Sequence, residues 1–327
     1  MDWSVVFTHA FLIGLAAATV RTAVPLLLAA VGEVFAERSG VLNIGIEGMM
    51  LFGALAGFAG AFFLQNAWIG ALTSAAAGIL LALAFAYVTV MLGADQITAG
   101  IALNILGLGL SAFLFRVAFG IEGLPPTAPS FGSIHLPGLS DLPVLGPVLF
   151  QHNPLVYLAV LLTVVAHVVL FYTTFGLRVR AAGEIPTAVD AAGVSVRRIR
   201  YAAVLIGGAT AGLAGAFLSL GHLNLFSEDM VAGRGFIALA VVIFGNWRPG
   251  GAVAASLLFG LAEAVQLRFQ ALGFRLPYQF LLMIPYVLTM LVMVGVVRRS
   301  TPPAALAVPY VRLRRQLAAS RLGAQET

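Results

Sequence analysis

Long apolar runs separated by short polar turns make up most of this sequence. A helix needs roughly 20 apolar residues to cross the hydrocarbon core of a bilayer, whereas a transmembrane β-barrel would show short segments of alternating hydrophobicity. The runs cover residues 9–31, 43–64, 68–91, 97–119, 154–175, 201–221, 235–247, 250–267 and 277–297. The pattern therefore predicts an all-α, polytopic transmembrane helical bundle with about nine membrane segments, in a range of about eight to ten.

Two of these runs, 235–247 and 250–267, are individually short and are joined by the turn NWRPGG. We expect them to form a tight helical hairpin that does not fully cross the bilayer. Such a hairpin needs cover from the rest of the bundle, because irregular backbone at membrane depth is tolerated only where protein or a water-filled cavity surrounds it.

The composition agrees with a membrane protein and excludes several kinds of chemistry. The chain is 61% hydrophobic and 9% charged, whereas soluble domains have about 25% charged residues. All 18 basic residues are arginine, so a GxxxxGK[ST] phosphate-binding loop cannot exist and the chain does not hydrolyse nucleotide by that route. Without cysteine it has no disulfides, thiolate metal sites or cysteine nucleophiles. No cluster has metal-ligand spacing, and no Ser/His/Asp constellation lies close in sequence, so we expect neither a metal site nor catalytic residues.

A polar segment at 176–201, GLRVRAAGEIPTAVDAAGVSVRRIRY, interrupts the apolar pattern. It contains five arginines, at positions 178, 180, 197, 198 and 200. Arginine-rich loops between membrane spans lie on the cytoplasmic side. This orientation also places the 300–327 tail in the cytoplasm and leaves the N-terminus outside. The tail mixes apolar residues with arginines, which suits a helix at the inner membrane surface.

The segment 120–153 differs in composition from the apolar runs, with six prolines and almost no charge. We interpret it as an ordered external loop. It is either a connector or a functional element, that is, a cap over the outer mouth of a pathway or a docking surface for an external partner.

Polar side chains inside the predicted spans are costly, and each is therefore a candidate for function. Asn43 and Glu47 lie one turn apart on one helical face, and Gln96 and Asn104 share a face with Gly100 between them. Asn43, Glu47 and Gln96 either line a path or cap their own helices. Asn104 lies deeper, and it either lines a hydrophilic path or makes an interhelical hydrogen bond.

A second pair, Glu263 and Gln266, shares a face of the run at 250–267. Glu263 either lies near the surface or pairs with an arginine, for which Arg234 and Arg268 are the candidates. Amides along helix faces can hydrogen-bond a neutral polar solute, whereas few buried charges argue against a strongly ionic one. The six polar residues are therefore candidates for a translocation path. Because the chain has no dense acid–base relay for proton coupling, uptake against a gradient would need energy from elsewhere.

Four stretches of the chain match the pattern of a known family. They are ERSGVLNIGIEGMMLFGA (37–54), DQITAGIALNILGLGLSAFLF (95–115), GRGFIALAVVIFGNWRPGG (233–251) and LFGLAEAVQ (258–266). They resemble permease subunits of bacterial ABC importers for nucleosides and simple sugars, within a superfamily that also contains ribose and branched-chain amino acid permeases. The resemblance spans nearly the whole chain and implies a single ABC importer transmembrane domain over 1–327, in the bacterial plasma (inner) membrane.

The polar loop also fits this family, in which it contains a short coupling helix that docks in a groove of the cytoplasmic ATPase. The family pattern is close to R-A-x-G-E-N-P-x-A-A-x-A-A-G, and this chain has RAAGEIPTAVDAAG at 180–193, with Ile185 where asparagine is usual. Glu184 and Pro186 suit a helix start, and Gly193 suits a helix end. The residues that carry the coupling prediction are Gly183, Glu184, Pro186, Ala188, Asp190, Ala191, Ala192 and Gly193.

The resemblance also implies partners. Two permeases would pair around a central pathway, as a heterodimer of related chains or, alternatively, as a homodimer, in contact with membrane lipid. Two ATPase chains would bind ATP and Mg²⁺ beneath them, so this chain would hold no cofactor. An external substrate-binding protein or lipoprotein would deliver the solute, and no nucleic acid is involved. A branched-chain amino acid permease and a self-sufficient secondary carrier remain as alternatives.

Overall fold

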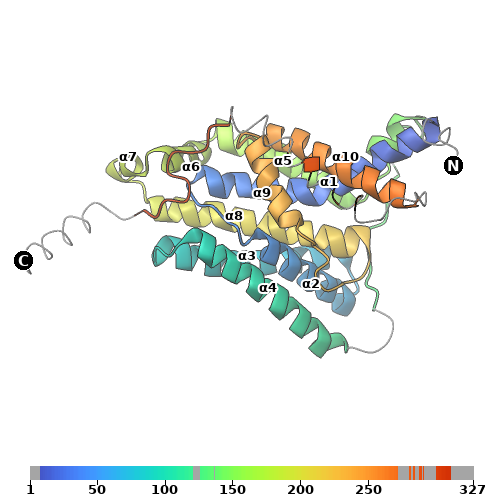
Figure 1. Cartoon of the computed structure of the whole chain (residues 1–327), viewed down its shortest axis with the longest axis horizontal. Helices are drawn as coiled ribbons and strands as arrows, with labels where there is room; N and C mark the ends of the chain where they lie inside the picture. The colour runs from blue at the N-terminus through green and yellow to red at the C-terminus, as the bar shows by residue number, and fades with distance from the viewer. Residues whose placement is uncertain are drawn as a thin grey trace, which may run out of the picture.

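The computed structural model describes residues 8–120, 126–135, 137–271, 280, 283, 287, 288, 290 and 300–310. Over these residues the fold is helical, without strands (Figure 1). The α-helices are α1 (His9–Arg38), α2 (Ile46–Leu64), α3 (Ala67–Ala86), α4 (Gln96–Phe119), α5 (Pro154–Tyr172), α6 (Thr174–Glu184), α7 (Pro186–Ala191), α8 (Val196–Ala216), α9 (Arg234–Phe244) and α10 (Pro249–Ala271). Three π-helical turns are η2 (Tyr87–Met91), η3 (Gly146–Phe150) and η4 (Phe217–His222). The predicted all-α bundle is confirmed.

Seven helices in the described part are long and apolar enough to cross a membrane. They are α1, α2, α3 with η2, α4, α5, α8 with η4, and α10. The eleven-residue α9 is shorter, at about 16 Å, and does not match the roughly 30 Å hydrocarbon core. Most of the predicted run at 277–297 lies outside the described residues, so the count of about nine segments stays a prediction.

Two helices extend further than the hydropathy pattern predicts. α1 continues through Pro25 and ends at Arg38 rather than near residue 31. α10 has 23 residues and reaches Ala271, so the expectation that the run at 250–267 is individually short is wrong, and α10 is long enough to cross. In both helices the apolar run is interrupted by charged residues such as Arg268, and these residues do not break a helix because arginine has a high helix propensity.

Local capping explains where many of the helices begin. A side-chain oxygen just before the helix accepts a hydrogen bond from a backbone N–H in the first turn, which satisfies donors that lack an intrahelical partner. The capping residues are Thr8, Asn66, Asp95, Asn153, Thr173 and Ser195.

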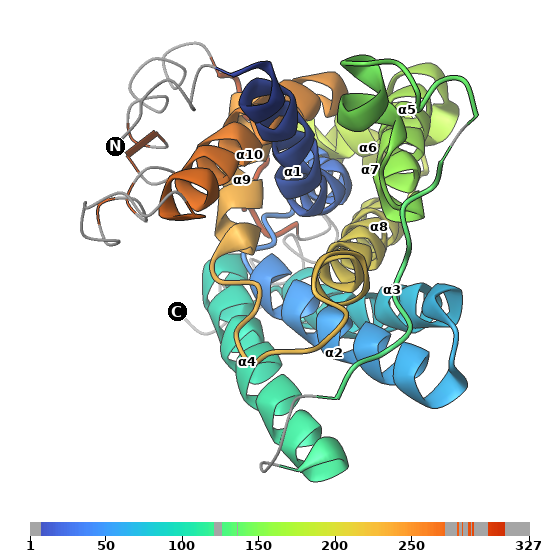
Figure 2. The same ribbon diagram turned by 90° about the vertical axis from the view of Figure 1, so that its right-hand side faces the viewer.

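Glycine contacts between α2, α3 and α8 form the centre of the bundle. A Cβ on Gly53 would lie 2.6 Å from the Cα of Gly212, and a Cβ on Gly208 would collide with Ala82 and the carbonyl of Gly78. Small residues of this kind let transmembrane helices approach closely. Figure 2 shows α8 between α1 on one side and α2 with α3 on the other, and α4 at the edge of the bundle.

The ends of several segments meet at the side that we call the Arg38 end, drawn on the left in Figure 1. A stretch at 300–310, the C-terminal strap, crosses this end. The Ala305 N–H donates to the carbonyl of Gly183 at 2.8 Å, and the Thr301 N–H donates to Oδ1 of Asn246 at 3.2 Å. The strap therefore ties α6 to the turn between α9 and α10.

The proline-rich loop lies at the opposite side, which we call the His222 end. Its Ala128 N–H donates to the carbonyl of Asn224 at 3.0 Å, and its Phe131 N–H donates to the carbonyl of Leu220 at 3.0 Å. The described part of the loop is thus fixed by backbone hydrogen bonds to η4 and to the residues that follow it. Its predicted role as a cap or docking surface stays a prediction.

Candidate functional site

The connection between α1 and α2, residues 39–45, is non-helical and buried inside the bundle. Ser39, Val41 and Asn43 are each 0% exposed. The Asn43 N–H donates to Oε1 of Glu33 at 3.0 Å, and the Asn43 amide lies 3.5 Å from the sulfur of Met49. Since buried backbone groups must find partners within the protein, this loop needs polar side chains from its neighbours.

α4 supplies two of those side chains. Oε1 of Gln96 accepts from the Leu42 N–H at 2.7 Å. Oδ1 of Asn104 accepts from the Gly48 N–H at 2.8 Å, and its amide donates to the carbonyl of Ile44 at 2.9 Å. The predicted common face of these two amides on α4 is therefore turned to the loop, and Asn104 makes an interhelical hydrogen bond.

Glu47 connects the start of α2 to α9. Its Oε1 accepts from the Gly233 N–H at 2.7 Å, and its Oε2 accepts from the Gly235 N–H at 2.6 Å. A carboxylate at a helix N-terminus also interacts favourably with the helix dipole. Glu47 lies in the first turn of α2, where an acid favours the helix dipole as expected, but the alternative that it caps this helix is wrong, because the cap position is Gly45 and has no side-chain bond.

Glu263 on α10 forms an ion pair with Arg234 at the start of α9, with 2.5 Å between Nη2 and Oε1. The same guanidinium donates to the carbonyls of Met230 and Val231 at 3.2 and 3.0 Å. Of the two predicted arginine partners, Arg234 is thus the one observed. Gln266, one turn further along α10, is buried.

The structure therefore divides the six polar candidates into two groups. Asn43 lies in the 39–45 loop, Gln96 and Asn104 bond to that loop, and Glu47 follows it at the start of α2. Glu263 and Gln266 lie on α10. The capping alternative for Gln96 is wrong, since Asp95 caps α4 by accepting from the Thr98 N–H at 2.7 Å. That bond and the Thr98 hydroxyl lower the pKa of Asp95. A role of the six residues in translocation stays a prediction.

A second polar cluster, at the Arg38 end, was missed by sequence reasoning. The indole Nε1 of Trp247 donates to Oε2 of Glu37 at 2.5 Å, and Nε of Arg38 donates to the carbonyl of Trp247 at 2.8 Å. These bonds join the end of α1 to the turn between α9 and α10. The available signal was the pair of acids at 33 and 37, one turn apart in an apolar run.

Arg200, one of the five arginines of the polar segment at 176–201, is buried rather than exposed at the loop surface. It is 2% exposed. Its Nε donates to the carbonyl of Ser39 at 3.1 Å, and its Nη1 donates to the carbonyl of Val308 at 2.9 Å. The planar guanidinium can serve several acceptors at once, so Arg200 is a buried link between the 39–45 loop and the C-terminal strap.

The predicted coupling segment contains the expected short helix, α7, with Pro186 at its first position. Gly193 follows the helix with a φ of +79°, a conformation that favours glycine. The prediction that Glu184 starts this helix is wrong, because Glu184 is the last residue of α6. Its Oε2 accepts instead from the Ala304 N–H of the strap at 3.3 Å.

The surface of the coupling segment is unevenly buried. Val189 points into the protein and is 7% exposed, whereas Ala188, Ala191 and Ala192 are exposed. Asp190 lies between these extremes. Three small exposed side chains on adjacent turns leave room for a close contact with another surface, which agrees with the predicted docking in a groove.

Comparison with known proteins decides the family. The sequence profile described as "Branched-chain amino acid transport system / permease component" matches residues 15–297. The chain belongs to this permease family. It is a multi-pass membrane protein, as the sequence predicted, and its relatives are transport permease subunits. Over the described residues, no three His, Asp or Glu side chains lie together in a way that could hold a metal ion.

Individual relatives show which permeases within this family the chain resembles. The guanosine ABC transporter permease protein NupQ of Bacillus subtilis is 38% identical over 91% of this chain and 96% of its own length. TsgC13 of Haloferax volcanii, which carries the name of a glucose ABC transporter permease protein, is 42% identical over 81% of this chain and 80% of its own. A second guanosine permease protein of Bacillus subtilis, NupP, is 29% identical over 79% of this chain and 75% of its own. No solved structure matches the chain. The permease family proposed from the four motifs is confirmed.

Proposed function

We propose that this chain forms one half of the translocation pathway of an ATP-driven importer for nucleosides or simple sugars. The observation that carries the proposal is the 38% identity to a guanosine permease over nearly the full length of both chains. Because one relative is named for glucose, we keep simple sugars among the proposed substrates of this chain. Both solutes are neutral and rich in hydrogen-bonding groups, which agrees with spans that contain amides and few charges.

The partner arrangement that we propose has two related permeases, two ATPase chains and an external binding protein or lipoprotein. Bacillus subtilis has two guanosine permease proteins that both match this chain, one at 38% and one at 29% identity. Two distinct chains for one solute favour a heterodimer. ATP and Mg²⁺ would bind to the ATPase chains, and this chain would hold no cofactor.

The orientation follows from the arginines. The Arg38 end carries the loop at 176–201, and arginine-rich loops lie on the cytoplasmic side. We therefore place α6, α7 and the C-terminal strap in the cytoplasm and the proline-rich loop outside. In this orientation the exposed alanines of α7 face the side on which an ATPase would dock.

Uptake by the reconstituted importer tests the proposal. The permease pair and its ATPase are placed in proteoliposomes with enclosed ATP, and radiolabelled guanosine, glucose and leucine are offered with the cognate binding protein. We expect ATP-dependent uptake of guanosine or glucose and none of leucine. Uptake of leucine alone would favour the branched-chain amino acid alternative. Solute movement by the purified chain alone along an ion gradient would make it a secondary carrier and overturn the proposal.

A further inference from the structure

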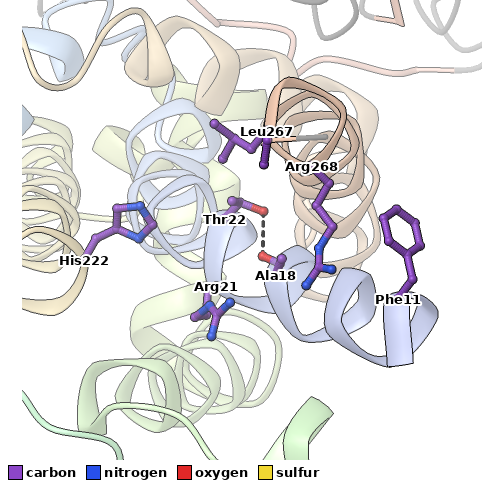
Figure 3. Close-up of a pocket in the computed structure, with 8 residues that line it drawn as sticks. Phe11, Ala18, Arg21, Thr22, His222, Leu267 and Arg268 are labelled. Carbon is purple, nitrogen blue, oxygen red and sulfur yellow. Dashed lines mark hydrogen bonds between the residues drawn. The ribbon is translucent and has the colours of Figure 1, made fainter. Parts of the chain in front are cut away.

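A cavity of about 380 Å³ opens near the His222 end, between α1, η4 and α10 (Figure 3). Its size falls within the range of pockets that hold small molecules. The lining residues are Phe11, Ala18, Arg21, Thr22, His222, Leu267, Arg268 and Ala271. Figure 3 shows Arg21, His222 and Arg268 arranged around it from three different elements.

Arg21 is the unusual member of this set. It is the thirteenth residue of the thirty in α1, yet its side chain is exposed. Among the described residues, no carboxylate forms an ion pair with it. An arginine in the middle of a membrane-spanning helix is costly against lipid, and such residues face a water-filled cavity or another protein surface.

Arg268 is held in position by apolar packing. Its guanidinium lies over the ring of Phe11, 5.3 Å from the centroid, and against Gly14, where any Cβ would collide with it. Among the described residues it also has no carboxylate partner. Two guanidinium groups that form no ion pair with a described carboxylate therefore line one cavity, from α1 and α10.

Polar contacts near this cavity connect three further elements. His222 lines the cavity from η4. Arg234 at the start of α9 pairs with Glu263 of α10 at 2.5 Å, and the N–H groups of Gly233 and Gly235 beside it donate to Glu47. Polar contacts thus join α10 to α9 and α9 to the start of α2.

We propose that this cavity receives the solute on the external side, and that Arg21 and Arg268 donate hydrogen bonds to acceptor atoms of a neutral solute. The inference rests on the proposed function. A guanidinium has five N–H donors and no acceptor, so it selects solutes with carbonyl oxygens, ring nitrogens or hydroxyl oxygens. The oxygen and nitrogen on one edge of guanine accept such a fork in bidentate fashion. A free amino acid fits less well, because its ammonium would need an acceptor and Glu263 is already paired.

Transport by charge-neutralised variants tests the role of the two arginines. In the complete importer, Arg21→Gln and Arg268→Gln should lower the rate of guanosine uptake about tenfold at saturating loaded binding protein, since each removes hydrogen bonds from a charged donor. Arg21→Lys should recover part of the rate. Arg116→Gln, the same change at an exposed arginine outside the cavity, should stay within about twofold of wild type. Wild-type rates in both cavity variants would overturn the inference, whereas a wild-type importer that moves neither guanosine nor glucose would overturn the proposed function instead.

Thiol labelling tests the location of the cavity without relying on activity. Because the chain has no cysteine, Arg21→Cys and His222→Cys introduce single thiols into a complex whose other subunits are free of reactive cysteine. A cationic, membrane-impermeant methanethiosulfonate reagent added outside should label both, and guanosine with its binding protein should slow the reaction. Ala76→Cys, an exposed position within α3, should stay unlabelled.

An unreactive Arg21→Cys would show that the cavity faces lipid or the second permease. Protection by guanosine 5′-monophosphate or anionic lipid but not by guanosine would show an anion site. Either result overturns the inference.

Discussion

The backbone N–H of Ala305 donates a hydrogen bond to the carbonyl of Gly183, with 2.8 Å between nitrogen and oxygen. Gly183 also packs on the carbonyl of Arg38, where a Cβ would collide. Gly183, in the last turn of α6 and three residues before α7, is therefore enclosed between the end of α1 and the C-terminal strap. A displacement of α7 by an ATPase would reach both of these segments through Gly183.

Gly183→Ala should destabilise this junction. The added methyl collides with backbone rather than with a flexible side chain, and overpacking of a tight contact costs about 1–3 kcal/mol. We expect a lower melting temperature of the purified complex and slower uptake. Gly250→Ala is the matched control, since a Cβ there would meet nothing within 4 Å. Equal melting temperatures for the two variants would contradict the tight packing at Gly183.

Bulky side chains on the exposed face of α7 should uncouple the importer. Ala188 and Ala191 are exposed, so Ala188→Trp and Ala191→Trp should leave the melting temperature of the isolated chain unchanged. If this face docks in a groove, the indole prevents the contact and solute-stimulated ATPase activity is lost. Ala76→Trp, on α3, makes the same change at another exposed alanine and should preserve the activity. Full stimulated activity in both α7 variants would exclude this face as the docking surface.

The helices and their beginnings were largely predictable, because apolar runs and capping residues such as Asp95 and Asn153 are local features of the sequence. The contacts of the 39–45 loop were not. Gln96 and Asn104 bond to backbone groups 54 to 60 residues away, and hydropathy does not encode which donors remain unsatisfied after folding. For the same reason, the sequence places Arg200 in the cytoplasmic loop but does not predict that partners on two distant segments bury it.

Asn104→Leu should reduce stability more than its size change suggests. The variant leaves the Gly48 N–H and the Ile44 carbonyl without their side-chain partner, and an unsatisfied buried polar group costs about 1–3 kcal/mol. The measurement is thermal unfolding of the complex in detergent. Ser111→Ala on the same helix is the control, because within the described part of the chain the Ser111 hydroxyl bonds only the Leu108 carbonyl of α4. If Asn104→Leu is as stable as the control but transports poorly, Asn104 acts in the pathway rather than in packing.

The ion pair between Arg116 and Glu228 gives a pH-dependent contribution at the His222 end. Nε and Nη2 of Arg116 each lie 2.7 Å from a Glu228 oxygen, and these bonds hold the pKa of Glu228 below its ordinary value of 4.5. A lowered folded-state pKa means that the stabilisation is complete above pH 4.5 and is lost as the pH falls through the folded-state pKa.

The difference in melting temperature between wild type and Glu228→Gln should therefore be largest at neutral pH and vanish in acid. It should be small and should shrink in high salt, since the pair is exposed. A difference that persists unchanged at pH 3 would show that the glutamine acts through packing and not through loss of the charge.

Glu47→Gln should weaken the junction between α2 and α9. The carboxylate accepts from two backbone N–H groups at the start of α9, and hydrogen bonds to a charged group contribute about 1.5–3 kcal/mol each. The carbonyl oxygen of glutamine can still accept from one of the two N–H groups. Its NH2 group is a donor and cannot accept from the other, so α9 loses one hydrogen bond and a favourable charge at its N-terminus. Because α9 also carries Arg234 and ends beside Trp247, its displacement should lower both the melting temperature of the complex and the uptake rate.

Glu228→Gln at neutral pH removes the same charge from an exposed site and should have a much smaller effect on both the melting temperature and the uptake rate. Equal effects of the two substitutions would mean that the Glu47 carboxylate is not what positions α9.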